Sequence, residues 1–192
     1  MADSKQVPLD AAAAAKAAFA SVQDKPFPDD IFTAPELRWA VIGCGVIANQ
    51  MAQSLALAGR KLAGVANRTL SKAQAFAEQY GVEKVYGTVE DLYADPDIDA
   101  VYITTPHNTH YGFMKKAILN KKHILVEKSI TLNSDELGEL IALADENNVV
   151  IGEAMTVYHM PIYKKLDEIL KSGTLGRVNL ITMNFGSFKE YD

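Results

Sequence analysis

The chain has 192 residues, of which 48% are hydrophobic and 22% are charged, a composition typical of a globular protein with a sizeable core. Its formal net charge of −5 and the lack of a basic run argue against nucleic acid as a partner. No apolar run approaches the length of a membrane span, which argues against a membrane protein. The single cysteine, Cys44, excludes an internal disulfide and favours a reducing compartment, so we expect a cytoplasmic protein.

Residues 1–36 form a segment of different composition. Asp10 is suited to cap an alanine-rich helix that ends near Val22, and prolines then keep the chain extended up to the first strand. One interpretation is an arm that packs on a partner subunit or near a cofactor; the other, which we favour, is a peripheral extension. The acidic Asp3, and the Lys16 that interrupts the alanines, are atypical of a signal peptide.

An apolar run over 37–42 predicts a buried parallel strand, which leads through two glycines into an apolar helical pattern. The sequence Gly-x-Gly-x-x-Ala in this strand–turn–helix context is the dinucleotide-binding fingerprint. Gly43 permits the tight turn, Gly45 lets the backbone approach a pyrophosphate, and Ala48 allows the helix to pack closely on the strand. An ordinary glycine-rich turn is the alternative. The residues predicted to bind the pyrophosphate, at the positive end of the helix dipole, are Gly43, Gly45, Val46 and Ile47.

Strand and helix patterns alternate through the residues that follow. The predicted strands are 61–66, 85–86, 98–104, 124–126 and 149–151. The predicted helices are one from a Ser71 cap to Gly81, short and medium ones at 89–93 and 110–119, and a long one capped by Ser134. This alternation implies right-handed crossovers. We therefore predict an α/β fold, a Rossmann-type doubly wound parallel sheet, over residues 37–155.

Residues 156–192 contain a helical pattern followed by a strand pattern. Residues 161–171 have the helical pattern, and the alternating apolar and polar side chains of 176–186 predict one long strand. A single strand leaves its backbone hydrogen-bonding groups unpaired. We therefore expect a homo-oligomer, or association through this segment.

The end of the second strand indicates which nucleotide is preferred. Dinucleotide folds that favour NAD place an acidic residue there, where it binds the adenosine ribose hydroxyls. Here Asn67 occupies that position, and Arg68 offers a planar guanidinium suited to a phosphate. We therefore predict NADP as the cofactor, with NAD as the alternative; an ordinary solvated Arg68 is the competing interpretation.

Two further polar segments, 104–110 and 126–129, follow the fourth and fifth predicted strands. The carboxyl ends of parallel strands share one edge of the sheet, where ligands of open α/β folds bind. Each segment alone is a weak signal, because a histidine near a helix start is often a cap and a Glu-Lys pair is commonly exposed. Their shared edge is what indicates a site.

These motifs resemble the glucose–fructose oxidoreductase/inositol dehydrogenase-type NAD(P)-dependent oxidoreductases. The resemblance runs from about residue 37 to the end of the chain and covers the amino-terminal half of such an enzyme. Within the family, the chain is most similar to dihydrodiol dehydrogenase-like and related sugar or polyol oxidoreductases. The marks of the resemblance are the glycine turn at 43–48, Thr105-Pro106-His107-Asn108-Thr109-His110, Glu127-Lys128-Ser129 and Gly152-Glu153-Ala154-Met155.

The resemblance implies hydride transfer between a nicotinamide cofactor and a hydroxyl or carbonyl group of a sugar, polyol or dihydrodiol, with no metal. It matches Lys128 to the family's active-site lysine, near the nicotinamide and the reacting oxygen. It matches Glu127 to the residue that partners this lysine and lies on the nicotinamide ribose. The loop beside the nicotinamide is matched by Pro106, Asn108 and His110, together with Thr105.

Two departures from the family pattern matter. The usual Glu-Lys-Pro is Glu-Lys-Ser here, so a proline-fixed geometry after Lys128 is not assured. The family also has a second domain, which builds the substrate pocket and supplies an acid/base group, commonly a histidine, beyond Asp192. By that resemblance, residues 156–192 are the start of a truncated second α+β domain, with 161–171 as the helix that bridges the two domains. A catalytically incomplete dinucleotide-binding module, acting as a sensor or completed by a partner, is therefore the alternative to an enzyme.

Overall fold

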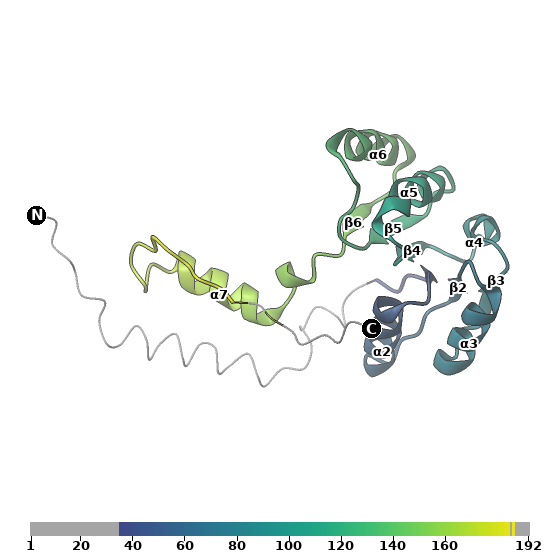
Figure 1. The fold of residues 1–192 in the computed structure, drawn as a ribbon, viewed down its shortest axis with the longest axis horizontal. Helices are drawn as coiled ribbons and strands as arrows, with labels where there is room; N and C mark the ends of the chain where they lie inside the picture. The colour runs from purple at the N-terminus through teal and green to yellow at the C-terminus, as the bar shows by residue number, and fades with distance from the viewer. Residues whose placement is uncertain (1–34, 185, 187–192) are drawn as a thin grey trace, which may run out of the picture. The chain divides into compact units, whose positions relative to one another are not determined.

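The computed structural model of the protein describes residues 35–184 and residue 186 (Figure 1). Residues 35–155 form one compact unit, and the residues from 156 onward belong to a second part of the chain, which we describe by itself. The helix and the proline-rich stretch predicted within residues 1–34 lie outside the described residues.

A six-stranded parallel sheet forms the centre of residues 35–155. Its strands are β1 (Trp39–Ile42), β2 (Gly64–Ala66), β3 (Lys84–Tyr86), β4 (Ala100–Ile103), β5 (His123–Val126) and β6 (Ile151–Glu153). Their order in the sheet is β3-β2-β1-β4-β5-β6, so the direction of winding reverses between the central pair, β1 and β4. This is the predicted Rossmann-type doubly wound sheet, and the reversal is the place where such folds bind ligands.

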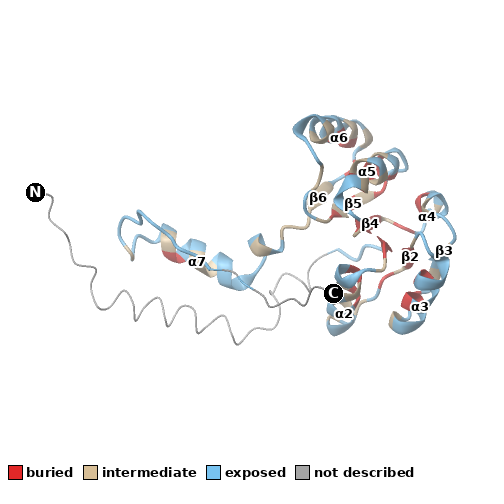
Figure 2. Ribbon diagram, in the orientation of Figure 1, coloured by how far each residue is buried: buried red, intermediate tan, exposed pale blue. Residues whose placement is uncertain are grey.

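Helices cover both faces of the sheet: α2 (Val46–Leu57), α3 (Leu70–Tyr80), α4 (Val89–Ala94), α5 (His110–Leu119) and α6 (Ser134–Asn147). Because successive side chains of a strand point to opposite faces, Ala40 and Ile42 of β1 enter one core and Val41 enters another. The first core is shared with α4, α5 and α6, and the second with α2 and α3. Figure 1 shows α2 and α3 on one side of the sheet and α5 and α6 on the other, and Figure 2 shows buried residues both in the strands and at places along these helices.

Two helix starts differ from the prediction. Helix α3 has Thr69 as its N-terminal cap instead of Ser71, because the Thr69 carbonyl already accepts the Lys72 N–H at 3.0 Å. Helix α6 is capped by Asn133 instead of Ser134, since the Asn133 side chain accepts a backbone N–H of the first turn at 2.9 Å. In both helices the cap is the residue that satisfies an otherwise unpaired N–H group, by its carbonyl or its side chain.

The ends of these two helices are also defined by the backbone. Gly81 ends α3 in the left-handed conformation, with φ of 66°, as predicted. At the end of α6, the Val149 N–H bonds back to the Ala144 carbonyl at 2.9 Å. Val149 therefore still belongs to the helix end, and β6 forms at Ile151–Glu153 instead of the predicted 149–151.

The part of the chain from residue 156 onward contains a short 3₁₀ helix, η3 (Thr156–Tyr158), and the helix α7 (Pro161–Lys171), which matches the predicted 161–171. Residues 176–184 form no strand, so the strand prediction is wrong for the described part of that segment. An alternating sequence becomes a strand only where another strand supplies hydrogen-bond partners, and the described residues supply none here. The assignment of 156–192 to a second domain stays a prediction.

Candidate functional site

The carboxyl ends of the strands meet at one edge of the sheet. The register pairs Ile42 with Ile103, and Ile103 with Val126, so β1, β4 and β5 end at the same level. Backbone hydrogen bonds continue the ladder one residue beyond several strands, with N–H donors in Gly43, Thr104, Glu127 and Ala154. The glycine turn and the two polar segments that follow β4 and β5 therefore begin side by side.

The two glycines of the turn have different surroundings. Gly43 has φ of +103°, which L side chains rarely adopt, and a Cβ there would lie 2.8 Å from Thr104 Oγ1. The Thr104 hydroxyl is itself held by a hydrogen bond of 3.1 Å to the Ile42 carbonyl, so it has little freedom to move. A Cβ on Gly45, in contrast, would meet nothing within 4 Å. The fold requires glycine at 43, whereas glycine at 45 leaves open space in front of the helix.

The first turn of α2 faces this open space. The first N–H groups of a helix lack intrahelical acceptors, and no acidic side chain stands in the first turn of α2. Ala48 and Ala52 are buried, as expected for close packing on the sheet. Val46 is 73% exposed, and Ile47, the first residue of the apolar helical pattern in the sequence, is 37% exposed. Unpaired N–H groups beside two exposed apolar side chains suit a phosphate carried by a larger organic molecule.

The end of β2 carries the polar and basic groups expected there. Asn67 is half-buried and donates to the Thr69 carbonyl at 3.0 Å, while Arg68 is exposed. Lys72, in the first turn of α3, was not predicted. Burial raises the pKa of the Cys44 thiol, and the charge of the Lys72 ammonium acts in the opposite direction. A signal was present in the sequence, because the first turn of a helix normally favours acidic residues.

The segment after β4 forms the 3₁₀ helix η2 (His107–Thr109) and the start of α5. Pro106 and Asn108 are exposed, and the Thr105 and Thr109 hydroxyls are 2.8 Å apart. His110 is fully buried: Nδ1 lies 2.8 Å from the Ser129 carbonyl oxygen and Nε2 lies 2.9 Å from the Thr105 carbonyl oxygen. His110 is therefore neither a helix cap nor an exposed ligand, but a bridge between the segments that follow β4 and β5.

The segment after β5 holds the predicted Glu-Lys pair. The hydroxyl of Tyr102, a residue of β4 that was not predicted, donates to Glu127 Oε1 at 2.5 Å. Burial, followed by the hydrogen bond to Glu127, raises the pKa of Tyr102, so its hydroxyl stays a donor. Lys128 is exposed, and its ammonium has no hydrogen bond or ion pair within the described residues. The peptide bond between Lys128 and Ser129 is cis.

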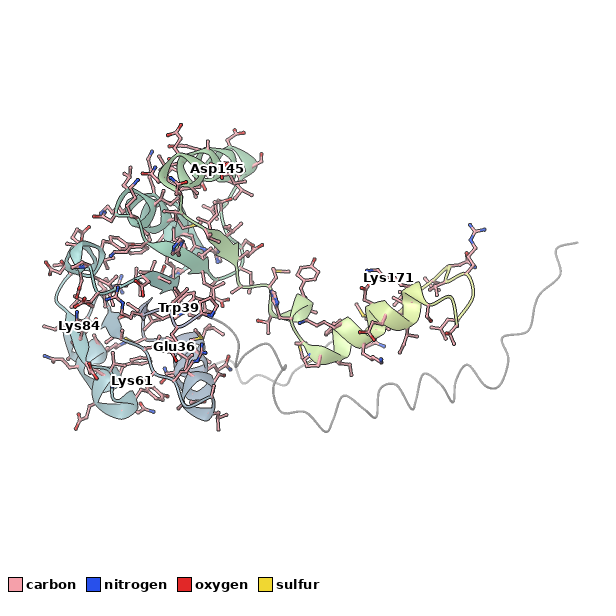
Figure 3. All side chains as sticks on the ribbon, turned by 180° about the vertical axis from the view of Figure 1, so that it is seen from behind. Glu36, Trp39, Lys61, Lys84, Asp145 and Lys171 are labelled. Atoms are coloured by element: carbon pink, nitrogen blue, oxygen red, sulfur yellow. The ribbon has the colours of Figure 1, made fainter. Side chains whose placement is uncertain are left out.

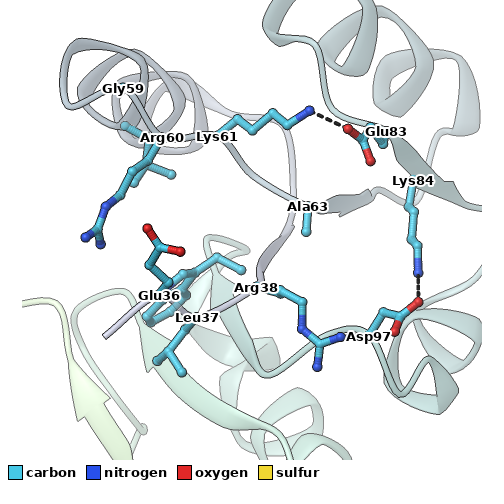
Figure 4. Close-up of a pocket in the computed structure, with 12 residues that line it drawn as sticks. Glu36, Leu37, Arg38, Gly59, Arg60, Lys61, Ala63, Glu83, Lys84 and Asp97 are labelled. Atoms are coloured by element: carbon cyan, nitrogen blue, oxygen red, sulfur yellow. Dashed lines mark hydrogen bonds and ion pairs between the residues drawn. The ribbon is translucent and has the colours of Figure 1, made fainter. Parts of the chain in front are cut away.

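A hollow of about 800 Å³ lies at the opposite edge of the sheet, around the amino ends of β1, β2 and β3 (Figure 4). Figure 3 labels Trp39, Lys61 and Lys84 in this part of the unit. Its charges pair with one another: Lys61 with Glu83, and Lys84 with Asp97 at 2.8 Å. None of the residues predicted for the site line this hollow, so we do not assign it to the site.

Two other kinds of site find no support in residues 35–184 and 186. No three His, Cys, Asp or Glu side chains gather there as metal ligands would. No helix of the same residues is long and apolar enough to cross a membrane.

Comparison with known families tests the resemblance directly. Residues 37–155 match the family model GFO_IDH_MocA, described as an oxidoreductase family with an NAD-binding Rossmann fold. The chain belongs to this oxidoreductase family. The matched residues include the glycine turn, both polar segments and the end of β6, and they coincide with the predicted Rossmann domain.

The chain matches only part of the length of its named relatives. The trans-1,2-dihydrobenzene-1,2-diol dehydrogenases of Xenopus tropicalis and Mus musculus are each 32% identical over 78% of this chain, which is 46% of their length. Among solved structures, a variant of KijD10, a 3-ketoreductase from Actinomadura kijaniata in complex with TDP-benzene and NADP, has a TM-score of 0.68 and 29% identity over 75% of this chain and 45% of its own. A probable dehydrogenase from Thermotoga maritima has a TM-score of 0.68 and 29% identity over 73% of this chain and 42% of its own. The chain thus spans less than half the length of these relatives.

Proposed function

We propose that the chain supplies the NADP(H)-binding part of an oxidoreductase that acts on a hydroxyl or carbonyl group of a sugar, polyol or dihydrodiol. The observation that carries this proposal is the meeting of the glycine turn, the loop after β4 and the Glu127–Lys128 pair at one edge of the sheet. The named relatives, dihydrodiol dehydrogenases and a 3-ketoreductase with NADP, support both the reaction class and the cofactor.

The residues present fit a dinucleotide phosphate. The open space at Gly45 and the unpaired N–H groups of α2 suit the pyrophosphate, beside Gly43, Val46 and Ile47. Near the adenosine end, Arg68 and Lys72 supply two positive charges for a 2′-phosphate and Asn67 supplies an amide for the ribose. The nicotinamide half would meet Glu127 and Lys128, with the loop of Thr105, Pro106 and Asn108 beside it, and His110 holding that loop from within.

A bound nicotinamide would supply or accept the hydride. Lys128 is exposed at the carboxyl edge as an ammonium, and we assign it to the substrate oxygen, where negative charge develops as a carbonyl is reduced. Glu127, held by Tyr102 at 2.5 Å, is oriented to accept hydrogen bonds from ribose hydroxyls. Lys128 is the catalytic residue of this proposal, and Glu127 binds and orients.

A dinucleotide-binding module whose substrate wall comes from elsewhere is the second candidate. It is favoured by the position of the cofactor edge, which lies entirely within residues 43–155. We place substrate binding with a domain that 156–192 begins, and we propose that copies of the chain associate through it. The cytoplasm is the proposed compartment, because a single half-buried cysteine suits reducing surroundings.

Two measurements on the purified chain test the proposal. NADPH fluorescence should rise saturably on titration with the chain, because the cofactor edge lies entirely within residues 43–155. Reduction of NADP, followed by absorbance with sugars, polyols and dihydrodiols, then separates the two candidates. Turnover by the chain alone supports the enzyme, binding without turnover supports the incomplete module, and the absence of saturable binding would remove both.

The preference for NADP is tested by Arg68→Ala. Loss of one charge-assisted contact to the 2′-phosphate should weaken NADPH binding by about 1.5–3 kcal/mol, or about 10- to 150-fold, and leave NADH affinity unchanged. Arg177→Ala, which removes an exposed arginine far along the chain from the fingerprint, is the matched control. Calorimetry on the unaltered chain that shows tighter binding of NADH than of NADPH would contradict the assignment of Asn67 and Arg68.

A further inference from the structure

One peptide group of the chain is held by side chains at both of its polar ends. The carbonyl oxygen of Ser129 lies 2.8 Å from His110 Nδ1, and the N–H of Ile130 donates to Glu153 Oε1 at 2.9 Å. These two atoms belong to the same peptide unit, the one between Ser129 and Ile130. His110 is the first residue of α5 and Glu153 is the last residue of β6, so the two contacts with this peptide come from two separate elements.

The His110 side chain has little freedom to move. The ring is fully buried, and its second nitrogen lies 2.9 Å from the Thr105 carbonyl oxygen. A neutral imidazole carries one N–H, which can donate to one of these two carbonyl oxygens, and the packed environment leaves the ring no room to turn. It connects the Ser129 carbonyl directly to the loop that follows β4.

The held peptide lies one residue beyond Lys128, between β5 and α6. Lys128 is exposed and its ammonium has no partner within the described residues, so the position of this side chain depends on its own backbone. The family pattern has proline at the next position, whose ring restricts φ, but this chain has Ser129 there. In this chain, hydrogen bonds to the Ser129–Ile130 peptide restrain the backbone after Lys128, where the family pattern has a proline ring.

We propose that His110 and Glu153, which we call the peptide clamp, are positioning residues that hold Lys128 at the nicotinamide end of the cofactor edge. The inference rests on the proposed NADP(H)-binding function and adds to it two residues that act through the backbone. Glu153 acts as a hydrogen-bond acceptor for Ile130 N–H; its negative charge has no role in the clamp. This distinguishes the clamp from direct binding of a ligand by the Glu153 carboxylate.

Two substitutions of Glu153 separate these roles. Glu153→Gln keeps a carbonyl oxygen that can accept the Ile130 N–H, whereas Glu153→Leu has similar bulk and no acceptor. Glu136→Leu is the matched control, because Glu136 Oε2 accepts the Leu132 N–H at 3.2 Å in the same connection but does not touch the clamped peptide. All variants are made in the full chain and titrated with NADPH and with 2′,5′-ADP, which carries only the adenosine half.

In Glu153→Leu, hydrogen exchange of the Ile130 amide, measured by NMR, should become at least ~10-fold faster because its acceptor is lost. The fluorescence enhancement of bound NADPH should fall, since the group beside the nicotinamide is no longer held, while 2′,5′-ADP affinity stays unchanged. Glu153→Gln and Glu136→Leu should resemble the unaltered chain in the Ile130 exchange rate and in NADPH fluorescence. A merely structural role for Glu153 would change 2′,5′-ADP affinity as well.

The possible failures are distinguishable. If the unaltered chain binds neither NADPH nor 2′,5′-ADP, the proposed function fails and the clamp's role fails with it. If it binds both and Glu153→Leu behaves like Glu153→Gln, the clamp is overturned and the function stands. An unprotected Ile130 amide in the unaltered chain, or loss of NADPH fluorescence in Glu153→Gln, would also overturn the clamp, whether or not the leucine variant folds.

Discussion

Replacing Gly45 with alanine is expected to remove NADP(H) binding and leave the fold intact. A Cβ at this position meets no protein atom within 4 Å, so the folded chain accommodates it. The same Cβ would occupy the space in which the pyrophosphate approaches the backbone. Loss of two charge-assisted hydrogen bonds at about 1.5–3 kcal/mol each predicts at least ~100-fold weaker binding of NADPH. Thermal unfolding and NADPH titration of one preparation measure both properties.

Gly43→Ala should behave differently, because here the fold itself excludes a side chain. Its φ of +103° is strained for alanine, and the new Cβ would lie 2.8 Å from Thr104 Oγ1. Strain of this kind costs about 1–3 kcal/mol, so Gly43→Ala should unfold at a lower temperature and also lose NADPH.

Gly112→Ala in α5, where a Cβ meets nothing within 4 Å, is the control for both glycine variants and should slightly stabilise the helix. Unchanged NADPH affinity in Gly45→Ala would place the pyrophosphate elsewhere. An unchanged unfolding temperature in Gly43→Ala would show that Thr104 and the turn can shift at no cost.

In an assembled, active form of the proposed oxidoreductase, Lys128→Met should abolish most turnover. The ammonium is assigned to an oxygen that becomes negative in the transition state, and removal of one such donor lowers kcat by about 10²–10³-fold. The dissociation constant for NADP(H) should stay unchanged, because the charge acts mainly in the transition state. Steady-state kinetics and NADPH titration of the same variant give the two values.

Lys116→Met provides the matched control for Lys128→Met. Lys116, a residue of α5, is also exposed, but its ammonium pairs with Glu90 at 2.7 Å on the surface, and such pairs contribute little to stability. Lys128→Arg, which keeps the charge, should retain more activity than Lys128→Met. A kcat for Lys128→Met equal to that of Lys116→Met would make Lys128 an ordinary surface lysine.

The sequence by itself determined the architecture of residues 37–155, because the features that encode it are local. Buried parallel strands appear as short apolar runs. The glycine turn encodes, within a few residues, the end of a strand, the start of a helix and the close approach of the backbone to a pyrophosphate. Once the strands are parallel, their carboxyl ends must share an edge, so the 104–110 and 126–129 segments could be brought together without a structure. The family match over 37–155 confirms that part of the prediction.

Only the tertiary structure decided how the side chains at that edge support one another. Tyr102 belongs to an ordinary strand pattern, and only the structure shows that its hydroxyl donates a hydrogen bond to Glu127. His110 and Glu153 bond to backbone atoms that stand 19 and 23 positions away along the chain, a separation that leaves no local pattern. The strand predicted at 176–186 was wrong in its described part for the same reason: helices bond within themselves, but a strand exists only with a partner that the local sequence does not specify.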